Sequence, residues 1–130
     1  MIKGEIYTHP ERFVISEQLI ERFAEASGDR NPIHLDNEFA EKSIFKKRIA
    51  HGFLIGSLIS NVLGNYFPGN GTIYLNQTMN FRRPVFIDDV ITVSIEVIDI
   101  NENRATLNTL CHNQLSKIVI SGTANVIINK

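Results

Sequence analysis

An aspartate and a histidine lie five residues apart in the segment SGDRNPIH, which spans residues 27–34. Enzymes commonly use a carboxylate and an imidazole to move protons near neutral pH. If Asp29 and His34 face the same space, they can hold a water molecule and exchange protons with it. Asp and Asn side chains also form ordinary turns, because they bond to nearby backbone N–H groups. The segment therefore predicts either an acid–base pair or a structural turn.

The apolar stretch IAHGFLIGSLISNVLG, residues 49–64, follows this segment closely. It is shorter than the ~20 apolar residues that cross a bilayer, and polar residues interrupt it, so it predicts a buried helix. Gly52 stands near the start of that helix, where a backbone N–H has no intrahelical acceptor and can bind developing negative charge. For His51 we predict hydrogen bonds to backbone groups at the helix start, with contact to a ligand as the alternative.

Two shorter helices are predicted on either side of the segment. Apolar residues recur at helical spacing over Glu17–Ala26, with Ser16 placed to cap the start and Gly28 to end the helix. A second helix is predicted over Asn37–Lys42, and Asp36 is placed to cap it. Because a proline disfavours helical backbone in the residue before it, the segment between these helices is predicted to be a loop.

Four runs rich in Ile, Val and Thr make up the second half of the chain, after the turn PGNG at residues 68–71. They are TIYLNQTMNF (72–81), VITVSIEVIDI (90–100), RATLNTLCHN (104–113) and IVISGTANVII (118–128). Their frequent alternation of apolar and polar residues is typical of antiparallel strands. Helices followed by such strands indicate the α+β class. A curved antiparallel sheet wrapped around the central apolar helix, the hot-dog fold, accommodates both, and its open edges predict a dimer.

Composition narrows the classes of partner. A chain of 130 residues with 43% hydrophobic content predicts a single domain over residues 1–130. The 13 basic and 14 acidic residues give a net charge of -1 without long runs of either sign, so neither nucleic acid nor a membrane surface is an expected partner. One cysteine excludes an intrachain disulfide, and the first residues lack the apolar core of a secretory signal, so a cytoplasmic location is expected.

Two other kinds of site fit the sequence less well. The four histidines are His9, His34, His51 and His112, and no pair has the local spacing of a metal-binding motif. No metal is therefore predicted, with ligands brought together by the fold as the alternative. Cys111 lies in an alternating predicted strand, so we expect a small buried side chain and not a nucleophile.

The stretch FAEASGDRNPIHLDNEFA, residues 23–40, closely resembles the signature of the MaoC-like (R)-specific enoyl-CoA hydratases, also called hydratase 2. The similarity continues through IAHGFL (49–54), GTIYL (71–75) and FRRPVF (81–86), so it covers most of the chain. Every polar position of the specific core GD-x-NP-x-H is filled.

This resemblance implies a MaoC-like hot-dog homodimer that adds water to a trans-2-enoyl-CoA, reversibly, to give the (R)-3-hydroxyacyl-CoA. It implies no cofactor, since coenzyme A is part of the substrate. Carried over by position, Asp29 and His34 become the catalytic dyad, the backbone N–H of Gly52 the oxyanion donor, and Asn31 a supporting polar neighbour. Ser60 corresponds to a position that lines the substrate pocket. Which residue of the dyad delivers which proton is left open.

Three alternatives share parts of this pattern. A dehydratase of the same fold, acting on an acyl-carrier-protein substrate or on another hydroxyacyl-CoA, would use the same dyad. A hot-dog thioesterase would direct water at the carbonyl carbon, and the GD-x-NP-x-H core argues against it. A non-catalytic acyl-CoA-binding protein would hold the thioester without turnover.

Overall fold

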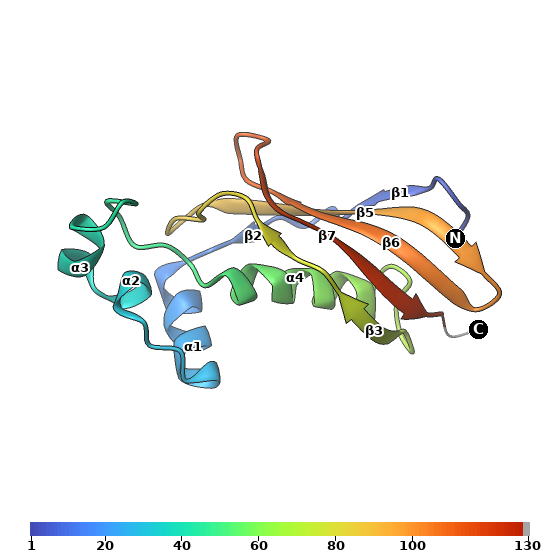
Figure 1. The fold of residues 1–130 in the computed structure, drawn as a ribbon, viewed down its shortest axis with the longest axis horizontal. Helices are drawn as coiled ribbons and strands as arrows, with labels where there is room; N and C mark the ends of the chain where they lie inside the picture. The colour runs from blue at the N-terminus through green and yellow to red at the C-terminus, as the bar shows by residue number, and fades with distance from the viewer. Residues whose placement is uncertain (129–130) are drawn as a thin grey trace.

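The computed structural model describes residues 1–128, so the last two residues of the predicted domain lie outside the described range (Figure 1). The helices are α1 (Glu17–Ser27), α2 (Pro32–Leu35), α3 (Asn37–Glu41) and α4 (Gly52–Asn65). The strands are β1 (Ile6–Thr8), β2 (Phe13–Val14), β3 (Ile73–Gln77), β4 (Asn80–Phe81), β5 (Val90–Asn101), β6 (Arg104–His112) and β7 (Ile118–Ile127). Three helices precede α4 and most of the sheet follows it, which confirms the α+β order.

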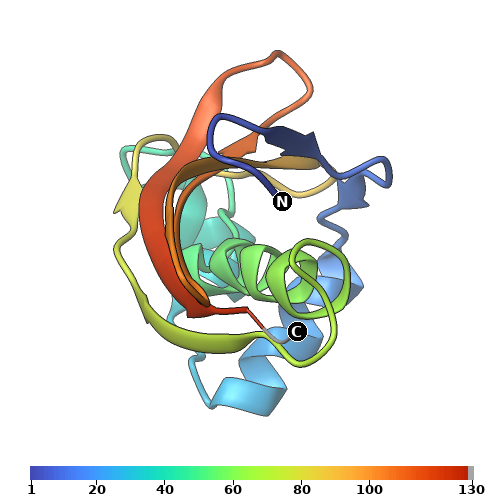
Figure 2. The same cartoon turned by 90° about the vertical axis from the view of Figure 1, so that its right-hand side faces the viewer.

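One antiparallel sheet of seven strands contains every described strand. Its order is β1-β5-β6-β7-β3, with β2 also paired to β5 and β4 to β7. The register shifts within the β5–β6, β6–β7 and β3–β7 pairs, and such irregularities bend a sheet. Viewed from the end, the sheet curves around α4, as predicted (Figure 2).

Helix α4 fills the hollow of the sheet. Its buried side chains are Leu54, Ile55, Leu58, Ile59, Val62 and Leu63. They share one core with the inward-facing residues of β5, β6 and β7. Burial of each such side chain contributes roughly 1.5–3 kcal/mol, so this contact fixes the position of the helix. No helix within residues 1–128 is long and apolar enough to cross a membrane.

Local signals set the ends of the short helices as predicted. The Ser16 hydroxyl accepts from the backbone N–H of Leu19 at the start of α1, and Gly28 ends that helix with φ 81°. Asp36 accepts from the first backbone N–H groups of α3. These caps leave residues 28–36 as a short link between α1 and α3.

The link is not a simple loop, and here the prediction was wrong. Pro32–Leu35 forms the short helix α2, whose first turn Asn31 caps by accepting from the N–H of Ile33. Proline stops a helix that precedes it, but its fixed φ suits the first position of a new one. The prediction used only the first of these two effects.

Four strands also differ from the prediction. β1 and β2 are too short to show a clear alternation. The run 72–81 divides into β3 and β4, both paired with β7. Between them the Thr78 carbonyl lies directly over Gly122, while Thr78 and Thr123 exchange hydrogen bonds. The close contact requires a residue without a side chain on β7.

Gly122→Ala should destabilise the fold, because a Cβ at this position would overlap the Thr78 carbonyl oxygen. We expect a loss of about 1–3 kcal/mol or more, the usual cost of overpacking. Gly64→Ala is the matched control, since a Cβ there meets open space and alanine favours a helix by roughly 0.5–1 kcal/mol. Urea unfolding midpoints measure both. Equal midpoints for the two variants would contradict the packing argument.

Candidate active site

The segment 27–34 turns through hydrogen bonds to its own side chains. The N–H of Asp29 donates to the Ser27 hydroxyl (3.1 Å), and the N–H of Asn31 donates to Oδ1 of Asp29 (3.2 Å). Asp29 is therefore a turn former. Oδ2, its other carboxylate oxygen, has no hydrogen-bond donor within residues 1–128. The turn thus leaves one oxygen of an exposed carboxylate available.

His34 lies in α2 and is buried. Its Nδ1 is 2.7 Å from the carbonyl oxygen of Ile49. A carbonyl oxygen can only accept, so Nδ1 carries the proton. In the neutral ring Nε2 is then a lone-pair acceptor. The backbone of a neighbouring segment therefore sets which nitrogen of His34 can take a proton.

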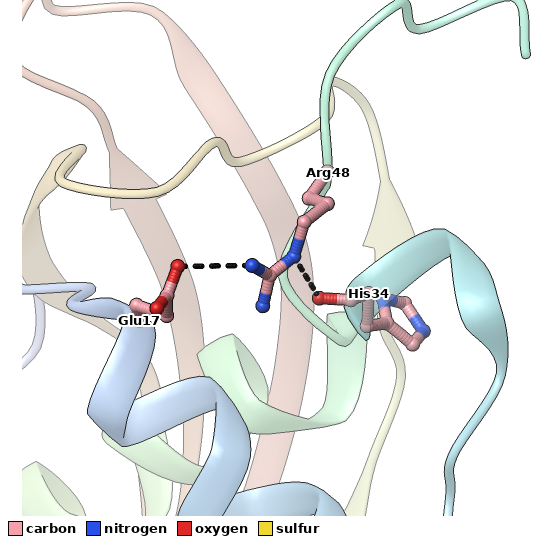
Figure 3. A network of polar contacts seen from close by, with 3 residues as sticks. All are labelled: Glu17, His34 and Arg48. Atoms are coloured by element: carbon pink, nitrogen blue, oxygen red, sulfur yellow. Dashed lines mark hydrogen bonds and ion pairs between the residues drawn. The ribbon is translucent and has the colours of Figure 1, made fainter. Parts of the chain in front are cut away.

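Arg48 holds the backbone of His34. Its Nε donates to the His34 carbonyl oxygen (2.8 Å), and its NH1 donates to Oε2 of Glu17 (2.9 Å) (Figure 3). The guanidinium is buried, whereas Glu17 is half exposed. One side chain thus ties the start of α1 to α2. No sequence pattern indicated this role, because Arg48 lies 14 residues from its acceptor in α2.

His51 contacts the same segment from the start of α4. The prediction for this residue was wrong, because its side chain does not cap its own helix. Its Nε2 is 2.9 Å from the Asp29 carbonyl oxygen, and the same argument places the proton on Nε2. Its ring stacks on His34 with 3.8 Å between centroids and 27° between planes. His51 therefore joins the two residues of the predicted pair.

These contacts bring three proton-binding groups together. One such atom from each of Asp29, His34 and His51 lies within 4.8 Å of the other two. Burial lowers the pKa of His34 below its ordinary value of 6.5, and His51 adds to that effect. The hydrogen bond to Ile49 and the charge of Asp29 act in the opposite direction. His34 is therefore mainly neutral at pH 7 and able to accept a proton.

The same three residues are of types that bind transition metals. The fold thus assembles possible ligands that local spacing does not reveal. That no metal takes part stays a prediction.

A pocket of about 460 Å³ opens beside these groups. Asp29, His34, His51 and Gly52 line it, and most of its remaining wall is apolar. Gly52 is the first residue of α4, so its N–H has no intrahelical acceptor and lies at the positive end of the helix. A Cβ on Gly52 would lie only 2.5 Å from Cε1 of Phe81. The missing side chain therefore lets Phe81 pack against the start of the helix.

A family model described as "MaoC like domain" matches residues 2–117. The chain belongs to the MaoC-like domain family. The predicted resemblance is confirmed.

Named relatives of this MaoC-like chain include two bacterial enzymes. It is 43% identical over 117 residues to a 3-hydroxybutyryl-CoA dehydratase of Methylorubrum extorquens, covering 89% of this chain and 74% of the relative. It is 42% identical over 106 residues to an (R)-specific enoyl-CoA hydratase of Aeromonas caviae, covering 80% and 79%. The unliganded structure of R-hydratase PhaJ1 from Pseudomonas aeruginosa superposes with a TM-score of 0.93 at 40% identity, covering 100% of this chain and 83% of that one. The hot-dog fold is thereby confirmed.

The other predicted site residues of the MaoC-like chain do not line the pocket of the pair. Asn31 caps α2 and so supports the segment, but it does not line the pocket. Ser60 lines a separate hollow between α4 and β3, together with Tyr74 and Gln77. Cys111 is fully buried as expected, and burial raises the pKa of its thiol to about 12, which disfavours the nucleophilic thiolate.

Proposed function

We propose that this MaoC-like protein adds water to the trans-2 double bond of an enoyl-CoA to give the (R)-3-hydroxyacyl-CoA, and catalyses the reverse dehydration. The observation that carries the proposal is the position of Asp29 and His34 beside Gly52 in one largely apolar pocket. The names of the two bacterial relatives support it, because hydration and dehydration are opposite directions of one type of reaction.

Asp29 and His34 are the proposed catalytic dyad. A water molecule between them can donate one hydrogen to the carboxylate of Asp29 and present the other to Nε2 of His34. Its oxygen bonds to C3 of the substrate while one of its protons is accepted by the dyad. A proton from the dyad is then transferred to C2, which restores the starting protonation state. Both new bonds form on the face of the substrate that meets the pair.

The backbone N–H of Gly52 is the proposed oxyanion donor. Attack at C3 moves negative charge onto the thioester oxygen, and a fixed donor aimed at that oxygen stabilises the transition state. The N–H at the start of α4 needs no reorientation, because the buried helix holds it in place. The apolar wall of the pocket suits the acyl chain.

Neither a metal nor a redox cofactor is needed in this scheme, since proton transfer and a backbone donor supply the chemistry. We propose further that residues 1–130 act as a single domain. A cytoplasmic setting is consistent with one buried free cysteine.

A second copy of the chain is the proposed partner at the edge of the sheet. β3 ends the strand order, so one of its sides is unpaired. Its residues Ile73, Tyr74 and Leu75 are exposed, as are Phe53 and Phe81. An apolar, unpaired edge strand favours association, and this supports a homodimer.

The purified protein should hydrate crotonyl-CoA or a longer trans-2-enoyl-CoA, measured as loss of the conjugated enoyl absorbance. Chiral analysis should give the (R)-alcohol, and chelator should leave the rate unchanged. Release of free thiol would instead indicate a thioesterase. Tight binding without turnover would indicate a binding protein, and faster turnover of carrier-protein thioesters would indicate a dehydratase of that class.

Asp29→Asn should lower kcat by about 10²- to 10⁴-fold, the usual contribution of a general acid or base. Asparagine keeps the Oδ1 acceptor of the turn, so only the basic oxygen is lost. Asp36→Asn is the control, because asparagine caps α3 about as well as aspartate. His34→Gln should be as slow as Asp29→Asn, and the double variant little slower than the poorer single one, since both act on one water. A fast Asp29→Asn enzyme would reduce the segment to a structural turn.

Size-exclusion chromatography with light scattering should give a molar mass twice that of the chain. Leu75→Lys places a charge on the exposed edge of β3 and should shift the protein towards the monomer. Leu115→Lys is the control, since Leu115 is 70% exposed and lies in the turn before β7. A monomeric parent protein, or equal dissociation by the control, would exclude this interface.

A further inference from the structure

We propose that His51 is a positioning residue for the acid–base pair. His51 holds Asp29 through its imidazole N–H and His34 through the face of its ring. This inference rests on the proposed hydration function.

Within residues 1–128, His51 is the one side chain that forms a hydrogen bond or ring stack with both members of the pair. It donates to the Asp29 carbonyl and stacks on the His34 ring. It is 2% exposed, and its ring contacts the rings of both Phe23 and His34. Phe23, from α1, packs against it at 4.9 Å between centroids in a tilted arrangement. Its Nε2–H holds the Asp29 carbonyl at 2.9 Å. The ring therefore has little freedom to move relative to either residue.

The hydrogen bond to Asp29 and the ring stack on His34 have different effects. The turn hydrogen bonds orient Asp29 only within its own segment, whereas the bond from His51 fixes Asp29 to the start of α4. The stacked ring covers a face of His34, whose Nδ1 is already held by Ile49. The first contact sets where the carboxylate lies, and the second limits the access of water to His34.

The charges around His34 determine the sign of the expected effect. The titratable groups next to its ring are Asp29 and His51, with Arg48 at its backbone and Glu17 beyond. Arg82 and Arg83 line the same pocket. Burial is the largest cause of the lowered pKa of His34, and the charge of His51 lowers it further. Removing the imidazole of His51 should therefore raise the pKa of His34, because both its charge and its cover of the His34 ring are lost. Because the protonated imidazole has no acceptor lone pair, the acid limb of the rate profile should move to higher pH.

A matched pair of variants separates the two contacts. His51→Gln keeps an N–H donor within reach of the Asp29 carbonyl and removes the ring face. Its kcat/KM profile should show the acid limb at higher pH, with activity recovering towards the parent value at alkaline pH. His51→Phe keeps the ring face and removes the donor. It should move the acid limb to higher pH by less than His51→Gln does, because it loses the charge of His51 but keeps a ring over His34. It should also lose about 10- to 100-fold in kcat at every pH, with a small change in KM.

His9→Phe is the structural control. His9 is also buried, but it lies in an aromatic cluster with Tyr7, Phe13 and Tyr66. This variant should change thermal stability without moving the acid limb. NMR titration of the His34 imidazole in the parent protein and in His51→Gln measures the change in the pKa of His34 without requiring turnover.

Three results are distinguishable. An active parent whose two His51 variants keep its kcat and its acid limb overturns the positioning role. An equal shift in His9→Phe also overturns it, because the effect would then be global. A folded parent without hydration activity contradicts the proposed function, while a raised pKa of His34 in His51→Gln would still support the contact between the rings.

Discussion

Burial of α4 in the hollow of the sheet is the constraint on which the candidate site depends. Six apolar side chains hold this helix against the core, so the position of its first turn is set by packing. Gly52 and His51 lie at that turn, and His34 is bonded to Ile49 just before it. The segment that carries Asp29 therefore lies against a helix whose position is fixed by packing.

Apolar burial and hydrogen bonding thus stabilise different parts of the molecule. The sheet and α4 are joined by apolar burial, whereas residues 28–36 also depend on hydrogen bonds to neighbouring segments, made through the backbone carbonyls of Asp29, His34 and Ile49. A typical hydrogen bond contributes about 0.5–1.5 kcal/mol net, but a buried polar group left unpaired costs about 1–3 kcal/mol. Arg48 is the clearest case, because its buried guanidinium binds both Glu17 and the His34 carbonyl. The polar contacts therefore set the orientation of residues 28–36 more than they add to the stability of the fold.

Local patterns were sufficient for the long strands β5, β6 and β7, the buried helix and the caps at Ser16 and Asp36, because each depends on neighbouring residues. They were insufficient for α2, where the two opposite effects of proline compete. The roles of Arg48 and His51 depend on contacts across 14 and 22 residues of sequence, which no local spacing encodes. The placement of Asp29 next to His34 followed from sequence proximity, whereas the reaction itself came from the resemblance to a family and not from the residues alone.

Both histidines of the site donate a ring N–H hydrogen bond to a main-chain carbonyl, that of Ile49 for His34 and that of Asp29 for His51. Every residue type supplies the same carbonyl, and it has no proton of its own to lose. The tautomers are therefore insensitive to which side chain occupies position 49, provided that the backbone path is kept. A substitution at position 49 can alter the shape of the pocket, which Ile49 lines, while leaving the proton-accepting nitrogen of His34 unchanged. The side chain at position 49 can therefore change the pocket without changing the tautomer of His34.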